Sequence, residues 1–292
     1  MKLTLSLLVL VAAPTLFGAA EDMEEAFQNL KQAVEGKKDP AEVKKLAEET
    51  YALAHEITEG QGAARAREVE VYTEYALYAT AVQAPPAAAV DLFSALEAQN
   101  PKSKYLETGY TRYLAALNQT GGASKIPAIA EKALANFPNN LDLLLLVVDS
   151  ARSRKQNDRA LNFAKRLVAV AEKKPAKPED VPPADWERKL RTALGTGHWI
   201  AGMVSYEKQQ FYAADKELRA ALPLIKGNDA LMGPALFSLG VANYQLGKQM
   251  NKKALVLEAA QFSEQAAALG GQLGQEAWRN AQLMKTDAGK MR

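Results

Sequence analysis

The apolar residues of this chain recur with the period of an α-helix along almost all of its length. From residue 21 onward they fall at i, i+3, i+4 and i+7, as in the stretch RALNFAKRLVAVAEK at 159–173. No segment alternates apolar and polar residues over the length of a strand between hairpin turns. We therefore predict an all-α protein of about thirteen helices, joined by short turns so that neighbouring helices run antiparallel.

Local signals mark individual helices within this pattern. Asp39 is a predicted N-cap, with Pro40 in the first turn and Glu42 three residues after the cap, a variant of the capping box. One run, LDLLLLVVDS at 141–150, is apolar enough to be a buried strand instead. We predict a buried helix there, because leucine dominates the run and helical segments flank it on both sides.

Residues 1–20 differ from the rest of the chain. Lys2 precedes an apolar stretch that ends in small residues, and the acidic run EDMEE follows at once. This order is typical of a secretory signal peptide with cleavage after Ala20. The alternative is an uncleaved membrane anchor, which the short apolar run disfavours. We expect an exported protein, periplasmic or secreted, with no stable membrane insertion after signal cleavage.

Composition excludes several classes of function. The 292 residues include no cysteine, which excludes disulfides, thiolate metal sites and a lipid anchor on a cysteine at the cleavage site. The net charge is +2 and there is no long basic run, so we expect no nucleic-acid partner. The hydrophobic fraction of 48% is that of an ordinary folded protein.

The helical pattern repeats along the chain. A shift of 34 residues brings the segment that contains Tyr113 onto the segment that contains Val147. The clearest copies carry a pair with a small second residue shortly before a tyrosine: Ala201-Gly202 with Tyr206, and Leu239-Gly240 with Tyr244. In its period and in these positions the chain resembles the tetratricopeptide repeat family.

This resemblance covers about residues 63–269, with 22–60 as a divergent first pair and 274–290 as a capping helix. It implies a tetratricopeptide-type helical-repeat solenoid of about six antiparallel helix pairs plus a C-terminal capping helix. Small residues would let the helices approach closely. In the capping helix we expect four residues to pack inward: Ala277, Trp278, Ala281 and Leu283.

The sequence divides into four parts. We assign a signal peptide to 1–20, N-terminal repeats to 21–172, a proline-rich segment to 173–185, and C-terminal repeats with the capping helix to 186–292. Four prolines keep the third part out of any helix interior. It is either a long surface loop within one solenoid, which we favour, or a hinge between two blocks.

Few residues suggest catalysis or metal binding. His55 begins the run HEITE, with Glu59 where a zinc site would need a second histidine, and the only other histidine is His198. We expect His55 to be a partly exposed helical residue and His198 to pack between helices.

The glycines at 195, 197 and 202 follow a charged helix rather than a strand, which argues against a dinucleotide-binding loop. No pair of carboxylates stands out. We predict no enzyme activity, no cofactor and no metal.

The family resemblance also implies a binding surface. In this family the first helix of each helix pair lines a concave groove. Ligands contact three positions of that helix, which we call slots. They are counted from the two-residue motif named above: two residues before its first residue, directly after its second residue, and four residues after its second residue. The early copies place Thr73, Leu77, Thr80, Thr111, Ala115 and Asn118 in these slots. The later copies place Leu145, Asp149, Arg152, Trp199, Met203, Tyr206, Phe237, Val241 and Tyr244 there. We expect the later set from Asp149 onward to form the binding site. The alternative is that its aromatic residues are core or lie under the capping helix.

From this resemblance we expect a non-catalytic scaffold that binds a protein or peptide partner in its groove, with a role in assembly of the cell envelope. A second hypothesis is a helical binding module for a small ligand or glycan, serving a transport or cell-wall enzyme system. A peptide groove predicts that Trp199→Ala or Tyr244→Ala weakens binding while the fold survives. If both changes unfold the protein, these residues are core.

Overall fold

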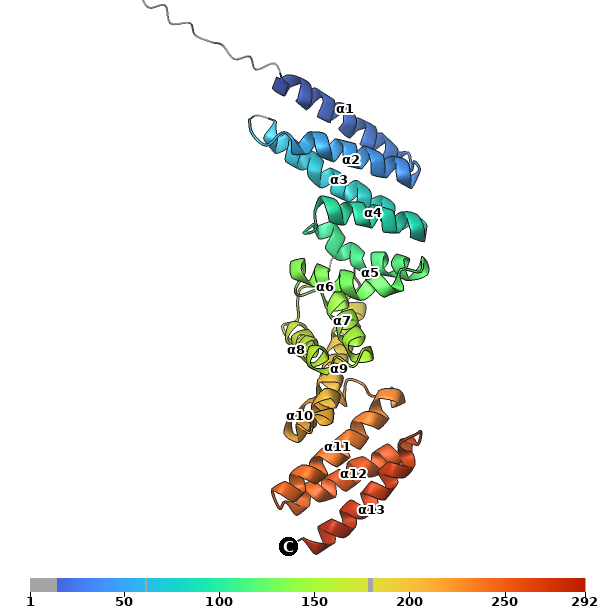
Figure 1. Ribbon diagram of the computed structural model, residues 1–292, viewed down its shortest axis with the longest axis vertical. Coiled ribbons are helices and arrows are strands. Elements are labelled where there is room, and N and C mark those ends of the chain that lie inside the picture. The colour runs from blue at the N-terminus through green and yellow to red at the C-terminus, as the bar shows by residue number, and fades with distance from the viewer. Residues whose placement is uncertain (1–14, 61, 178–180, 292) are drawn as a thin grey trace, which may run out of the picture. The chain divides into compact units, whose positions relative to one another are not determined.

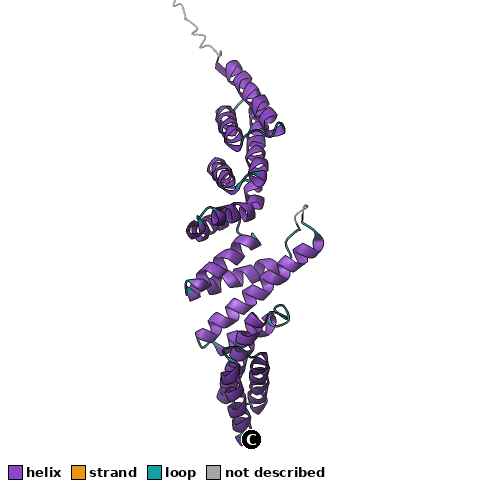
Figure 2. Cartoon of the chain, turned by 90° about the vertical axis from the view of Figure 1, so that its right-hand side faces the viewer, coloured by secondary structure: helices purple, strands orange, loops and turns teal. Residues whose placement is uncertain are grey.

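The computed structural model describes residues 15–60, 62–177 and 181–291 (Figure 1). Over this part of the chain it contains thirteen α-helices, one short 3-10 helix and no strand (Figure 2). The predicted all-α class and helix number are therefore confirmed. The helices divide into two compact units, Met1–Ile126 (unit 1) and Pro127–Arg292 (unit 2), and each is described by itself.

Unit 1 contains the first five α-helices. Their bounds are α1 Thr15–Glu35, α2 Pro40–His55, α3 Ala63–Gln83, α4 Pro86–Gln99 and α5 Lys104–Gln119, followed by the 3-10 helix η1 Ala123–Lys125. Consecutive helices pack side by side (Figure 1). In addition, α3 contacts both α1 and α5, and α2 contacts α4. The odd-numbered helices therefore form one layer of the unit and the even-numbered helices the other.

Unit 2 contains the remaining helices. Their bounds are α6 Ile126–Asn136, α7 Leu141–Ser153, α8 Asn157–Glu172, α9 Pro183–Glu207, α10 Phe211–Ala221, α11 Asp229–Gln249, α12 Lys253–Leu269 and α13 Gly274–Lys290. From α7 to α13 every helix contacts the next one. The odd-numbered helices α7, α9, α11 and α13 also contact one another in succession. Unit 2 thus repeats the two-layer arrangement of unit 1.

The N-cap at Asp39 and the leucine-rich run have the structural roles that we predicted. The Asp39 side chain accepts a hydrogen bond from the Ala41 backbone N–H at 2.9 Å, and Pro40 is the first residue of α2. The leucine-rich run at 141–150 forms α7 rather than a strand. Leu143 and Leu144 of this helix are fully buried, which explains why the run is apolar on several sides.

The glycines of α9 allow close contact with neighbouring helices. A Cβ atom on Gly197 would lie 2.6 Å from Val168 Cγ2 of α8, and one on Gly202 would lie 2.5 Å from Leu218 Cγ of α10. Both positions are therefore restricted to glycine by packing. Both lie inside α9, a 25-residue helix that also includes the charged segment before them.

The proline-rich segment joins two helices that pack against each other within unit 2. Trp186 Nε1–H, in the first turn of α9, donates a hydrogen bond to the Pro175 carbonyl oxygen at 3.3 Å. Residues 178–180, in the middle of the segment, lie outside the described residues. The division between the two units falls at Ile126–Pro127.

The predicted signal peptide lies largely outside the described residues, which begin at residue 15. Helix α1 starts at Thr15 and runs without a break past the predicted cleavage point after Ala20. Among the helices described here, none combines the length and the hydropathy that a bilayer span requires.

The predicted packing of the last helix is right for two residues and wrong for two. Ala277 and Ala281 are buried, together with Met284. Trp278 and Leu283 are instead 59% and 53% exposed. The buried positions follow a strict helical spacing, so Trp278 and Leu283 fall outside the contact face.

Candidate functional site

Three of the predicted groove residues pack into contacts between helices of unit 2. The Trp199 indole N–H donates a hydrogen bond to the Leu231 carbonyl oxygen at 3.0 Å. Its ring and the Met203 side chain pack on a buried cluster that includes Leu218 and Leu239. Phe237 packs on a second buried cluster, around Leu236, Ala266 and Ala277. All three predicted groove residues are half-buried and held between neighbouring helices.

Two other predicted residues, Tyr206 of α9 and Tyr244 of α11, interact with residues of α13. The Tyr244 hydroxyl donates a hydrogen bond to Asp287 Oδ2 at 2.6 Å, and this bond raises the pKa of Tyr244 to about 12. Burial raises the pKa of the Tyr206 hydroxyl, with a further contribution from Glu276. Val241 is half-buried in the same helix as Tyr244. The Tyr244–Asp287 hydrogen bond thus joins α11 to α13.

The predicted polar residues of α7 differ in their environment. Asp149 is exposed. Arg152 is ion-paired: its Nη1 donates a hydrogen bond to Glu207 Oε2 at 2.9 Å and another to Asn157 Oδ1 at 3.2 Å. This pairing joins α7 to the end of α9, so the guanidinium is already engaged within the protein. Whether Asp149 or the exposed parts of the aromatic side chains bind a ligand stays a prediction.

The Arg152–Glu207 pair predicts an acid-dependent loss of stability. The hydrogen bond from Arg152 holds the pKa of the Glu207 carboxyl below its ordinary value of 4.5. A carboxyl with a lowered pKa contributes stability above its unfolded pKa and loses it as the pH falls through the folded pKa. We therefore expect wild type to be more stable than Glu207→Gln at pH 7, and the difference to shrink below about pH 4.5.

Urea unfolding at a series of pH values measures this difference. Glu187→Gln is the matched control, because Glu187 is an exposed carboxylate on the same helix. We expect Glu187→Gln to stay within about 0.5 kcal/mol of wild type at every pH. If the difference in stability between wild type and Glu207→Gln does not change with pH, the ion pair with Arg152 is not its cause.

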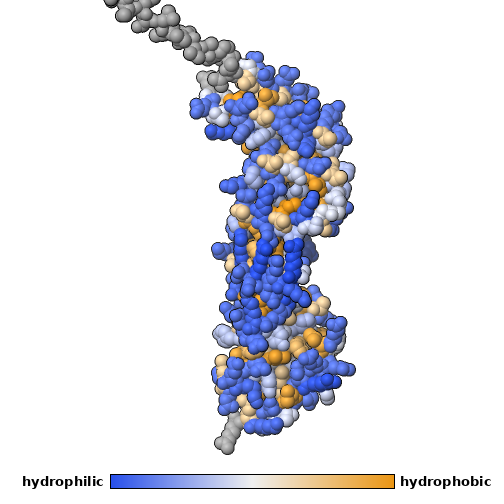
Figure 3. Space-filling view, in the orientation of Figure 1, coloured by the Kyte–Doolittle hydropathy of each residue, from blue (hydrophilic) through white to orange (hydrophobic). Residues whose placement is uncertain are grey.

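The largest exposed apolar side chains of unit 1 lie along one face of α3. Val71, Tyr75 and Val82 are 47%, 41% and 43% exposed, and we call these three residues the α3 stripe. Their spacing of four and seven residues places them on one side of a helix. On the face of unit 1 seen in Figure 3, hydrophobic side chains reach the surface between polar ones. Soluble proteins keep such clusters small unless they bind something.

The slots that the family resemblance implies do not lie on the exposed face of α3. Thr73 and Leu77, which the slots assigned to the groove, are fully buried. Thr80 is half-buried and lines a cavity described below. In α5 the slots give the solvent-facing side, because Thr111, Ala115 and Asn118 are exposed. From Tyr75 to Val82 the sequence of α3 is apolar except for Thr80, so the pattern of this half of the helix carries no signal for which face lacks a neighbour.

A series of aromatic rings links the α3 stripe to both neighbouring helices of its layer. The ring centroids of Phe27 and Tyr72 lie 5.1 Å apart, and those of Tyr72 and Tyr75 lie 5.8 Å apart. Tyr75 is also 5.8 Å from Tyr105 of α5. Such contacts hold aromatic rings in fixed orientations. Tyr75 is therefore an exposed ring that its neighbours already position.

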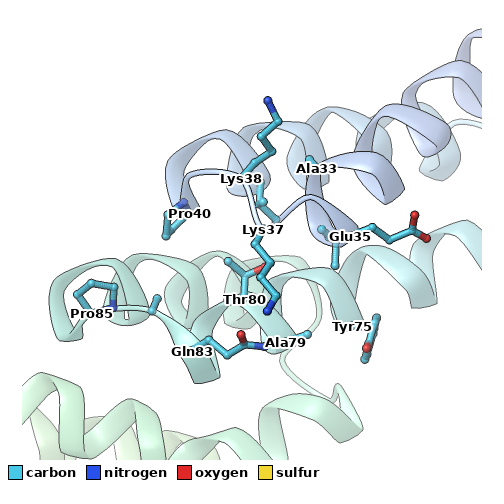
Figure 4. A pocket seen from close by; sticks show the side chains of 13 residues that line it. Ala33, Glu35, Lys37, Lys38, Pro40, Tyr75, Ala79, Thr80, Gln83 and Pro85 are labelled. Atoms are coloured by element: carbon cyan, nitrogen blue, oxygen red, sulfur yellow. The ribbon is translucent and has the colours of Figure 1, made fainter.

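A cavity of about 490 Å³ adjoins Tyr75 (Figure 4). It lies between the turn that joins α1 to α2 and the C-terminal half of α3. The lining includes apolar residues from α1, α2 and α3, the α3 residues Tyr75 and Gln83, one acidic residue of α1, Glu35, and two lysines of the turn, Lys37 and Lys38. The cavity and the α3 stripe share Tyr75, and together they form our candidate functional site.

Both histidines are paired with carboxylates. His55 Nδ1 lies 2.8 Å from Glu70 Oε1, and its side chain is 67% exposed, in agreement with a partly exposed helical residue. His198 Nδ1 lies 2.7 Å from Glu217 Oε2, and its side chain is 15% exposed between α9 and α10. In the part of the chain that the structure describes, no three histidine, aspartate or glutamate residues are grouped so that they could hold a metal ion.

A scan against protein-family models and a search of curated proteins give no match to this chain. The resemblance to tetratricopeptide repeats therefore rests on residue spacing. The site itself is defined by the side chains of unit 1.

Proposed function

We propose that this protein is a non-catalytic helical-repeat scaffold of the tetratricopeptide type that binds a protein or peptide partner through unit 1. The order of the helices supports the repeat: α1 to α12 can be grouped into six successive pairs, and α13 follows them. Alternate helices contact one another within each unit, as expected when helix pairs stack. Small residues at close helix contacts, such as Gly202 and Gly240, support the same interpretation.

The observation that carries the binding proposal is the exposure of the α3 stripe. Val71, Tyr75 and Val82 are the side chains that a partner would cover, and covering apolar surface is favourable. Tyrosine is frequent among the residues that dominate binding energy at protein interfaces. Because its neighbours hold the Tyr75 ring, little side-chain entropy is lost on binding. The proposed site thus lies in the early helix pairs and not in the late ones.

We also propose that the protein is exported and acts in the cell envelope. The support for export is the order of residues 1–20, with Lys2, an apolar stretch and small residues before an acidic run.

Replacing Tyr75 tests the binding proposal. A library of random peptides displayed on phage is selected on the purified, immobilised protein, and enriched peptides are synthesised. We expect Tyr75→Ala to raise the dissociation constant of these peptides by about tenfold or more, because it removes the central ring of the site. The dissociation constants are measured by fluorescence anisotropy.

Tyr212→Ala is the matched control, because Tyr212 is 72% exposed and belongs to unit 2. We expect this control to bind the enriched peptides as wild type does. An equal loss of peptide affinity in Tyr75→Ala and Tyr212→Ala would reject peptide binding by unit 1. So would a selection in which wild type enriches no peptides. Failure to enrich peptides together with saturable binding of soluble glycan fragments would favour the second hypothesis, a module for a small ligand or glycan.

A further inference from the structure

The cavity beside Tyr75 has an apolar wall and a cationic side. Ala33 and Val43 contribute from α1 and α2, and Ala79 contributes from α3. Lys37 and Lys38 lie in the turn between α1 and α2. Figure 4 shows Lys37 extending across the cavity towards Gln83 of α3, while Lys38 points in the opposite direction. Glu35 of α1 also lines the cavity, and Figure 4 shows its side chain pointing away from Lys37. An apolar surface and the charge of Lys37 therefore meet in the part of the cavity next to α3.

The turn holds Lys37 in a defined place. The Lys37 N–H donates to the Val34 carbonyl oxygen at 3.1 Å, and the Lys38 N–H donates to the Ala33 carbonyl oxygen at 3.0 Å. Lys37 adopts a left-handed backbone conformation, with φ of 49°. These bonds close the end of α1, so the direction in which Lys37 leaves the backbone follows from the helix ending itself.

The two lysines lack an acidic partner within the described residues, which sets them apart from nearby lysines of α2. Lys44 lies 3.9 Å from Glu48, and Lys45 lies 3.7 Å from Glu49. The charge of Lys37 is thus available to a ligand. Gln83 at the same cavity offers amide N–H groups, which are also hydrogen-bond donors.

We propose that this cavity binds a peptide segment in which a large apolar side chain lies next to a carboxylate. The apolar side chain contacts Ala79 and the Tyr75 ring, and the carboxylate accepts hydrogen bonds from Lys37 and Gln83. This inference rests on the proposed function of unit 1 and specifies its ligand. The carboxylate belongs either to an acidic side chain or to the C-terminus of the peptide, since both present the same oxygen atoms.

The test compares peptide selection by wild type and two double variants. Lys37→Asn with Lys38→Gln removes both charges at the cavity, and asparagine tolerates the left-handed backbone at position 37. The control, Lys44→Gln with Lys45→Gln, removes the same charge from α2. The probe is a library of random peptides displayed with free C-termini. We expect wild type and the control to enrich sequences with an apolar residue beside Asp, Glu or the C-terminus, and the cavity variant to lose that acidic preference.

Affinities of one enriched peptide give the size of the effect. We expect the cavity variant to raise its dissociation constant by about tenfold, because a hydrogen bond to a charged group is lost. Gln83→Met tests the same contact from α3 without changing the turn, and we expect a smaller increase. Amidation of the peptide C-terminus and replacement of its acidic residues by amides show which carboxylate is bound. Circular dichroism verifies that each variant is folded.

Each other outcome overturns the inference. Enrichment of apolar peptides with no acidic preference would leave peptide binding by unit 1 intact and reject the role of Lys37. Equal loss of affinity in the cavity variant and the α2 control would indicate general attraction by charge rather than a site. No enrichment on wild type would reject the proposed function and this inference together.

Discussion

We expect Trp199→Ala to lower the free energy of unfolding by about 3 kcal/mol, the cost typical of truncating a large aromatic side chain in a core. The Trp199 ring packs on the buried cluster around Leu218 and Leu239. The substitution also removes the hydrogen bond to the Leu231 carbonyl oxygen. Urea unfolding followed by fluorescence measures the loss in unit 2, which contains all three tryptophans of the chain.

Trp278→Ala is the matched control for this prediction. It removes the same side chain from α13, where Trp278 is 59% exposed, so we expect a change within about 0.5 kcal/mol. A small effect of Trp199→Ala on stability, combined with loss of binding to selected peptides, would place Trp199 in a binding groove after all. That result would contradict its assignment to the packed layer between α9 and α11.

The second large effect is expected for Gly202→Val, which we expect to destabilise unit 2 by about 3 kcal/mol through overpacking. A Cβ atom at this position would lie 2.5 Å from Leu218 Cγ and 3.0 Å from the Leu218 backbone nitrogen. Leu218 is fully buried, and buried side chains are closely packed, so we expect α9 and α10 to be pushed apart. Urea unfolding measures the change, and circular dichroism shows how much helix remains.

Gly289→Val in α13 is the control for the second prediction. No atom lies within 4 Å of a Cβ built on Gly289, so the added side chain meets open space. Valine also has a higher helix propensity than glycine, and we expect equal or slightly higher stability. A comparable loss in both variants would show that the cost comes from the helix backbone and not from the contact with Leu218.

The helices of this protein could be predicted from the sequence because their signals are local. Asp39 and Pro40 define the start of α2, and the leucine-rich run at 141–150 is helical as its composition indicated. Gly202 could be predicted to be a packing position, since a small residue in a long helix usually marks a close approach. The pairing of His198 with Glu217 was not predicted, because these residues lie 19 positions apart on different helices.

The candidate site could not be predicted in the same way. Tyr75 of α3 and Trp199 of α9 are both aromatic residues in helices that are apolar on several sides. Trp199 is half-buried because α10 and α11 pack around it. Tyr75 remains 41% exposed because the neighbours of α3 leave one side of the helix uncovered. The site predicted in the late repeats and the exposed stripe in the early repeats therefore differ in how far neighbouring helices cover them.

The sequence by itself determined that the chain folds into a series of helices, where α2 begins, and that Gly202 and Gly240 lie at close helix contacts. Periodicity, capping residues and helix propensity act over a few residues, so they are present in the sequence. Only the tertiary structure decided which apolar faces are covered. Coverage depends on contacts between helices, such as those of α3 with α1 and α5, which leave the α3 stripe and the cavity with Lys37 open to a partner.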